Sequence, residues 1–126
     1  MPFSRITTNF CLENEPVFID QFHKIMMAVL KIPDNDRIVA LDQKTKGFYQ
    51  PTNYSGKYIV FEIAMLSGRT IETKRKLYKN LIALASSVGG ESCSANVILK
   101  EVEKENWGVE RGQPASDVDL GFKTNI

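Results

Sequence analysis

The sequence has little excess charge of either sign and no long hydrophobic run. Its 126 residues include 16 lysines and arginines against 15 acidic residues, which gives a formal net charge of +1. This balance argues against a basic face that binds nucleic acid or an anionic membrane. The longest apolar run, YIVFEIAML at residues 58–66, is much too short to span a bilayer. We therefore expect no nucleic-acid partner and no membrane partner.

Cysteine and histidine are also scarce. Cys11 and Cys93 show neither metal-ligand spacing nor the pattern of a disulfide framework, and His23 is the single histidine. Free thiols are typical of a reducing compartment, and no hydrophobic region of a signal peptide precedes the first strand. The sequence thus predicts a cytoplasmic protein that binds no metal.

The order strand, helix, strand occurs twice along the chain. Alternating or apolar β-rich segments predict four strands, at residues 2–8, 37–41, 58–66 and 95–104. Apolar residues at helical spacing predict two helices, at residues 14–33 and 71–88. Pro16 suits the first turn of one helix, and Thr70 is the expected N-cap of the other.

These elements predict a single α+β (α/β) domain over residues 1–126. It consists of two β-α-β units at 1–44 and 58–103, a loop or arm at 45–57 and a C-terminal tail at 104–126. Right-handed crossovers then give a four-stranded mixed sheet with both helices on one face. Because its strands are apolar, the uncovered face predicts oligomerisation through the sheet or its edges.

Four sequence stretches are informative through their order and spacing along the chain: MPF, PDNDRIVAL, LSGRTIETKRKLYKNL and ENWGVERG. With the doubled β-α-β, they resemble the tautomerase superfamily, which includes 4-oxalocrotonate tautomerase, macrophage migration inhibitory factor and malonate semialdehyde decarboxylase. The resemblance covers essentially the whole chain. It implies a homotrimer whose sheets form an inner barrel, a small carboxylate substrate, and chemistry without a cofactor.

The resemblance makes Pro2 the first catalytic candidate. If Met1 is removed, Pro2 carries a free secondary amine, a class of group whose pKa is ordinarily about 7.7–8.0. Nearby cations and burial lower such a pKa and create a neutral base near physiological pH. An amine whose pKa stays high would act as an acid instead. Alternatively, Pro2 is simply a residue tolerated at a strand edge.

Arg69 and Asp36 are the other catalytic candidates. Arg69 lies at a helix start after a buried strand, where a guanidinium can grip a substrate carboxylate. The resemblance gives Asp36 a role in orienting water or the proline amine. Arg37 is expected either to lower the pKa of the Pro2 amine or to pair with Asp36.

Four residues are expected to bind substrate: Arg37, Trp107, Arg111 and Phe122. Trp107 and Phe122 would form an apolar wall, which strengthens the charges beside it. Both also suit a place in the core or at a subunit interface. Arg111 is expected to reach a neighbouring site.

The sequence leaves three functions open. The first is a cofactor-free tautomerase that moves a proton on a small 2-oxo acid or enol. The second is a lyase similar to malonate semialdehyde decarboxylase or to dehalogenases and hydratases. Against it, Ser67 stands where the decarboxylase has a second arginine. The third is a non-catalytic trimeric binding protein that retains Met1, because an acylated proline nitrogen is not a base.

Overall fold

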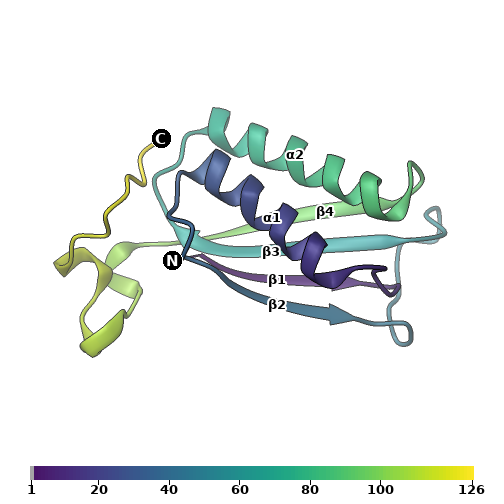
Figure 1. Ribbon diagram of the computed structural model, residues 1–126, viewed down its shortest axis with the longest axis horizontal. Coiled ribbons are helices and arrows are strands. Elements are labelled where there is room, and N and C mark those ends of the chain that lie inside the picture. Colours follow the sequence, from purple (N-terminus) through teal and green to yellow (C-terminus); the bar gives the residue numbers. More distant parts are fainter. Residues whose placement is uncertain (1) are drawn as a thin grey trace.

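The computed structural model describes residues 2–126, so the fate of Met1 lies outside the described residues. The elements follow in this order: β1 (Phe3–Thr8), α1 (Glu15–Leu30), β2 (Ile38–Gln43), β3 (Tyr58–Leu66), α2 (Ile71–Gly89) and β4 (Ser94–Val102). Three short 3₁₀ helices complete the chain, η1 (Lys104–Asn106), η2 (Glu110–Gly112) and η3 (Ala115–Asp117). Both α-helices cover the same face of the sheet (Figure 1).

The sheet has the order β2-β1-β3-β4. β1 is parallel to β2 and β3 is parallel to β4, whereas β1 and β3 are antiparallel, with Phe3 opposite Ala64. The predicted fold class is therefore confirmed. This topology gathers the starts of β1 and β2 and the ends of β3 and β4 at one end of the sheet. The C-terminal segment leaves β4 at that same end (Figure 1).

Local signals set the helix ends. The α1 helix begins after Asn14, whose side chain accepts a hydrogen bond from the Val17 amide at 3.2 Å. It ends at Leu30, earlier than expected, because Lys31 adopts a left-handed conformation with φ of 58° and closes the last turn onto Met27. The predicted N-cap of α2 is confirmed, since the Thr73 amide donates to Thr70 Oγ1.

The core lies between the helices and the sheet. Phe18 and Phe22 of α1 stack on Phe61 of β3, with ring centroids 6.5 and 5.8 Å apart. Leu77 and Leu81 of α2 are fully buried in the same cluster. Each such side chain stabilises the fold by about 1.5–3 kcal/mol. Neither helix within residues 2–126 is both long and apolar enough to cross a membrane.

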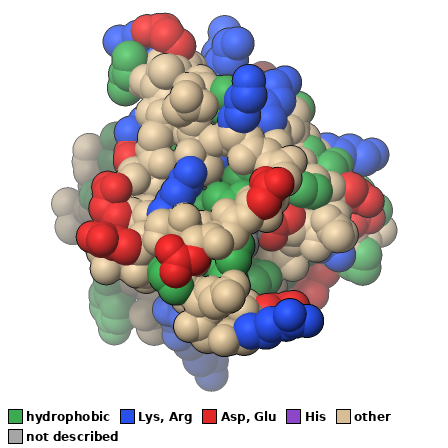
Figure 2. Space-filling model, turned by 90° about the vertical axis from the view of Figure 1, so that its left-hand side faces the viewer, with side chains coloured by type: hydrophobic (Ala, Val, Ile, Leu, Met, Phe, Trp, Pro, Cys, Tyr) green, Lys and Arg blue, Asp and Glu red, His purple; other side chains and the backbone are tan. Residues whose placement is uncertain are grey.

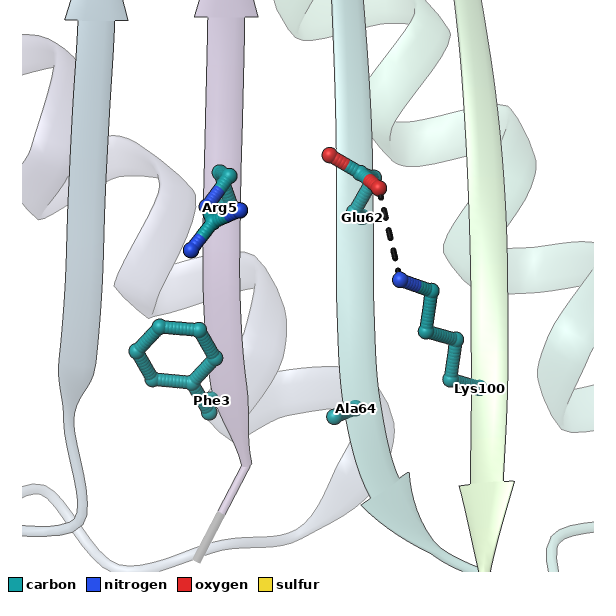
Figure 3. A pocket seen from close by; sticks show the side chains of 5 residues that line it. All are labelled: Phe3, Arg5, Glu62, Ala64 and Lys100. Carbon is teal, nitrogen blue, oxygen red and sulfur yellow. Dashed lines mark hydrogen bonds and ion pairs between the residues drawn. The ribbon is translucent and has the colours of Figure 1, made fainter.

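The other face of the sheet is open. Figure 3 shows Phe3 and Arg5 of β1, Glu62 and Ala64 of β3, and Lys100 of β4 side by side on it. Lys100 Nζ lies 3.5 Å from Glu62 Oε1, and the hollow that these five residues line has a volume of about 130 Å³. The face thus combines charged side chains with an exposed aromatic ring.

The C-terminal tail packs on the turn between β3 and α2. Thr124 is buried there, and the main-chain oxygen of Ile126 accepts hydrogen bonds from the hydroxyls of Thr70 and Thr73. Gly68 allows this close approach. Its φ is +128°, and a Cβ at this position would lie 2.8 Å from the Thr124 carbonyl oxygen.

We expect the substitution Gly68→Ala to lower the free energy of unfolding by about 2–4 kcal/mol, because it adds a backbone collision to the strain of a positive φ. Gly121→Ala is the matched control, since Gly121 has φ of 74° and no atom within 4 Å of its would-be Cβ. That variant should lose about 1–2 kcal/mol. Urea denaturation at one fixed protein concentration measures both, and equal losses would contradict the packing argument.

Candidate active site

Pro2 lies at the start of β1, at the end of the sheet where the C-terminal segment returns. It is buried and lines a narrow pocket together with His23 of α1 and with Asp36 and Arg37 of the loop before β2. The free volume beside Pro2 is about 10 Å³, close to the space of a single water. The pocket around Pro2 is therefore a tight, desolvated environment that two charged side chains and an imidazole border.

This Pro2 pocket adjoins a larger cleft. Asp36 and Ile38 line both, and the cleft has a volume of about 590 Å³. Its other wall consists of Trp107, Val109 and Arg111, together with further residues of the C-terminal segment. Figure 2 looks onto this end of the molecule, where hydrophobic side chains lie between basic and acidic ones. A small molecule in the cleft would lie beside Asp36, which also borders the Pro2 pocket.

A tight turn shapes the outer wall of the cleft. Main-chain hydrogen bonds close it, from the Ala115 amide to the Trp107 carbonyl and from the Val109 amide to the Gln113 carbonyl, both at 2.8 Å. At its tip Arg111 adopts a left-handed conformation with φ of 68°. Such strain in a residue other than glycine costs about 1–2 kcal/mol and concentrates at functional sites.

The loop between α1 and β2 carries the charged residues of the Pro2 pocket. The Asp36 amide donates to the Pro33 carbonyl at 3.1 Å and forms a turn. Arg37 Nη1 donates to Asp20 Oδ1 of α1 at 2.9 Å. Arg37 therefore forms an ion pair with Asp20. Because this pair is largely exposed, it adds little stability of its own.

Arg69 has different neighbours from those expected of a substrate ligand. It is 6% exposed, and its Nη1 and Nη2 donate to the carbonyls of Leu66 and Leu30 at 3.2 and 3.1 Å. Its Nε is buried without a hydrogen-bond partner. Burial lowers the pKa of the guanidinium, and the carboxylate of Glu101 acts in the opposite direction. Arg69 thus joins the end of α1 to the end of β3.

The predicted site residues fall into two groups. The first group lines the Pro2 pocket or the adjoining cleft and consists of Pro2, Asp36, Arg37, Trp107 and Arg111. Arg69 and Phe122 form a separate group, in which the Phe122 ring centroid lies 5.8 Å from the Arg69 guanidinium carbon. Neither of these two lines the pocket or the cleft.

His23 is the residue that sequence reasoning missed. Its Nε2 lies 2.6 Å from the Asp34 carbonyl oxygen, and its side chain is buried in the wall of the Pro2 pocket. A signal was present, because His23 falls between Phe22 and Met26 on the buried stripe of α1. Across residues 2–126, no group of three or more His, Cys, Asp or Glu side chains could hold a metal.

The sequence model of a family described as tautomerase enzyme matches residues 30–110. A 2-hydroxymuconate tautomerase from Comamonas testosteroni is 39% identical over 49 residues, which cover 38% of this chain and 78% of that protein. The residues that match the family model include the loop that carries Asp36.

Solved structures show the same fold at low sequence identity. Pt0534 inactivated by 2-oxo-3-pentynoate has a TM-score of 0.80 at 20% identity and covers 93% of this chain and 99% of its own. A fused 4-OT symmetric trimer has a TM-score of 0.78 at 14% identity, with 92% and 99% covered. FG41 malonate semialdehyde decarboxylase inhibited by 3-bromopropiolate has a TM-score of 0.69 at 20% identity, with 87% and 90% covered.

The substitution Arg69→Met distinguishes a structural arginine from a substrate ligand. It removes both donors and leaves the carbonyls of Leu30 and Leu66 unpaired, so we expect a loss of about 2–4 kcal/mol in the free energy of unfolding. Arg69→Lys should recover part of this loss. Thermal and urea unfolding measure the effect. A variant of wild-type stability that shows only a raised KM would instead make Arg69 a substrate ligand.

Proposed function

Since this chain belongs to the tautomerase enzyme family, we propose that it isomerises a small 2-oxo acid between its keto and enol forms, with the amine of Pro2 as the acid–base group. The observation that carries the proposal is that the buried Pro2 pocket and the open cleft lie next to each other and share Asp36 as a lining residue. Removal of Met1 is a condition, because it frees the nitrogen that an acyl group otherwise occupies.

The chemistry needs one group that both accepts and returns a proton. The neutral amine takes a proton from the carbon beside the carbonyl, and the electron pair of that C–H bond moves into the enol double bond. The carbonyl oxygen becomes an enolate, which then takes the proton back from the protonated Pro2 amine and restores the neutral base. The reverse sequence ketonises an enol. Burial of Pro2 and the nearby Arg37 favour the neutral amine, which is the form required of a base, whereas the carboxylate of Asp36 favours the protonated form.

The cleft supplies the binding groups. Arg111 lies on its outer wall, and no hydrogen bond or ion pair with another residue of 2–126 occupies its side chain. We assign the substrate carboxylate to Arg111, since guanidinium groups bind carboxylates in a two-point geometry. Trp107 provides an apolar surface beside it. Arg69, whose donors already serve two carbonyls, is assigned to holding the fold.

The position of Asp36 supports a second candidate function, that of a lyase that activates a water molecule. Its carboxylate borders both the Pro2 pocket and the cleft, so it lies where a water could be activated next to a substrate. Ser67 counts against a decarboxylase, because its hydroxyl donates to Glu103 Oε1 at 2.9 Å where the decarboxylase has an arginine. Release of CO₂ from malonate semialdehyde, measured beside enol ketonisation, separates these two activities.

We further propose that the chain assembles as a homotrimer through the open face of its sheet. Phe3, Ile38 and Ile98 are exposed on this face and would be removed from water in an assembly. Fused 4-OT trimers are among the structures with the same fold. Arg5 and Lys100 would then face neighbouring subunits or the interior of a barrel.

The substitution Ile98→Glu tests this assembly. Ile98 is 46% exposed on the open face, and a carboxylate there should dissociate the trimer to monomers in sedimentation equilibrium. Ile82→Glu is the matched control, because Ile82 is 40% exposed on α2, on the helical side of the sheet. It should leave the mass unchanged. Equal masses for wild type and Ile98→Glu would contradict an interface on this face.

The substitution Pro2→Ala tests the catalytic proposal. We expect kcat/KM for ketonisation of enols such as phenylenolpyruvate and 2-hydroxymuconate to fall by about 10²–10⁴-fold, because the secondary amine is replaced by a primary amine on a more mobile chain. Absorbance assays on protein from which Met1 has been removed measure the loss of kcat/KM. Intact-mass analysis must first show that Met1 is absent from both proteins.

Protein that retains Met1 is the informative control for this experiment. Its Pro2 nitrogen is an amide, so it should be inactive with an unchanged fold. Equal activity with and without Met1 would refute the role of the amine and leave the non-catalytic binding trimer as the better description.

A further inference from the structure

We infer that His23 is a positioning residue of the Pro2 site. The hydrogen bond from His23 Nε2 to the Asp34 carbonyl holds the loop at residues 31–37 so that Asp36 stays against Pro2. The kinetic side of this inference rests on the proposed function, whereas its geometric side does not.

The local chemistry fixes the direction of the bond. Asp34 contributes a carbonyl oxygen at 2.6 Å, which can only accept, so His23 Nε2 carries the hydrogen. The ring is 5% exposed among Phe22 and Met26, and a buried imidazole is costly unless its polar atoms find partners. The Asp34 carboxylate lies farther away, at 3.7 Å, and its side chain is 90% exposed, so solvent weakens that attraction.

The loop is held at three places. Arg69 donates to the Leu30 carbonyl at its start, His23 donates to the Asp34 carbonyl in its middle, and Asp20 pairs with Arg37 at its end. Of these three holding side chains, His23 is the one that also lines the Pro2 pocket. It therefore contacts the proline environment and the loop at the same time.

The residue that His23 binds is close in sequence to Asp36, so loss of the hydrogen bond should affect the position of Asp36 directly. Asp34 precedes Asp36 by two residues, and the turn from Pro33 to Asp36 joins them. If the bond from His23 is lost, the turn can shift relative to Pro2. A misplacement of about 1 Å in a reacting geometry can cost about 10²-fold in rate. Arg111 lies on the opposite wall of the cleft, so binding of the carboxylate should change little.

Four variants distinguish the effect of the His23 hydrogen bond from the effect of the side-chain volume of His23. His23→Gln places an amide nitrogen near the position of Nε2 and keeps the donor. His23→Asn carries the same group on a shorter side chain that does not reach Asp34, and His23→Leu has no donor. Asp34→Asn is the matched control, because it keeps the main-chain carbonyl and removes the carboxylate.

Two readouts are measured on processed protein, kcat and KM for enol ketonisation and the pH titration of the ¹⁵N-labelled Pro2 amine by NMR. We expect His23→Asn and His23→Leu to lower kcat by about 10–100-fold with KM within about twofold, and to shift the midpoint of the Pro2 titration. His23→Gln and Asp34→Asn should resemble wild type in both readouts.

Several results would overturn the inference. One is a wild-type kcat and an unchanged Pro2 midpoint in His23→Leu, and another is a loss in His23→Gln as large as that in His23→Leu. If His23→Leu fails to fold, the comparison of His23→Gln with His23→Asn decides in the same way. If the wild type ketonises no enol, the proposed function fails, and the Pro2 titration alone tests His23, with equal midpoints in all variants refuting it.

Discussion

The antiparallel pairing of β1 with β3 is the constraint on which the rest of the structure depends. It joins two β-α-β units, each parallel within itself, and it reverses one relative to the other. The start of the first strand therefore lies beside the end of the third, and the tail that follows β4 returns to the same end (Figure 1). The parallel pairing of β1 with β2 places Pro2 beside the α1–β2 loop. The reversal brings the segment after β4, with Trp107, to the same end, whereas a sheet with four parallel strands would place that segment at the opposite end.

Buried polar side chains then set the fine geometry at that end. Arg69 and His23 each donate to main-chain carbonyls where α1 gives way to the loop. A buried donor stabilises one arrangement strongly, because any other arrangement leaves both the donor and the carbonyl unpaired. The hydrophobic core determines how the helices pack on the sheet, whereas these hydrogen bonds determine the position of the α1–β2 loop. On the opposite wall of the cleft, Arg111 holds a strained left-handed backbone conformation at the tip of the turn.

Sequence reasoning named residues that the fold brings together as well as residues that it places elsewhere. Pro2, Asp36, Trp107 and Arg111 were named through a family resemblance, and they line two adjoining cavities that share Asp36. Arg69 was named for its place at a helix start after a buried strand, yet in the structure its guanidinium donates to carbonyls. The sequence of a turn arginine followed by a helix does not show whether the side chain points to a ligand or into the protein interior. His23 was passed over because helical spacing shows which side a residue faces but not which partner it meets.

The sequence by itself determined the elements, their order and their connections, since these follow from interactions within a few residues. Alternation and apolar runs identify the strands, capping side chains begin the helices, and the handedness of crossovers leaves few topologies. The tertiary structure decided which distant side chains meet: Arg37 with Asp20, His23 with Asp34, and Phe122 with Arg69. Such contacts depend on small differences in packing and desolvation among many alternatives, and no local pattern encodes them.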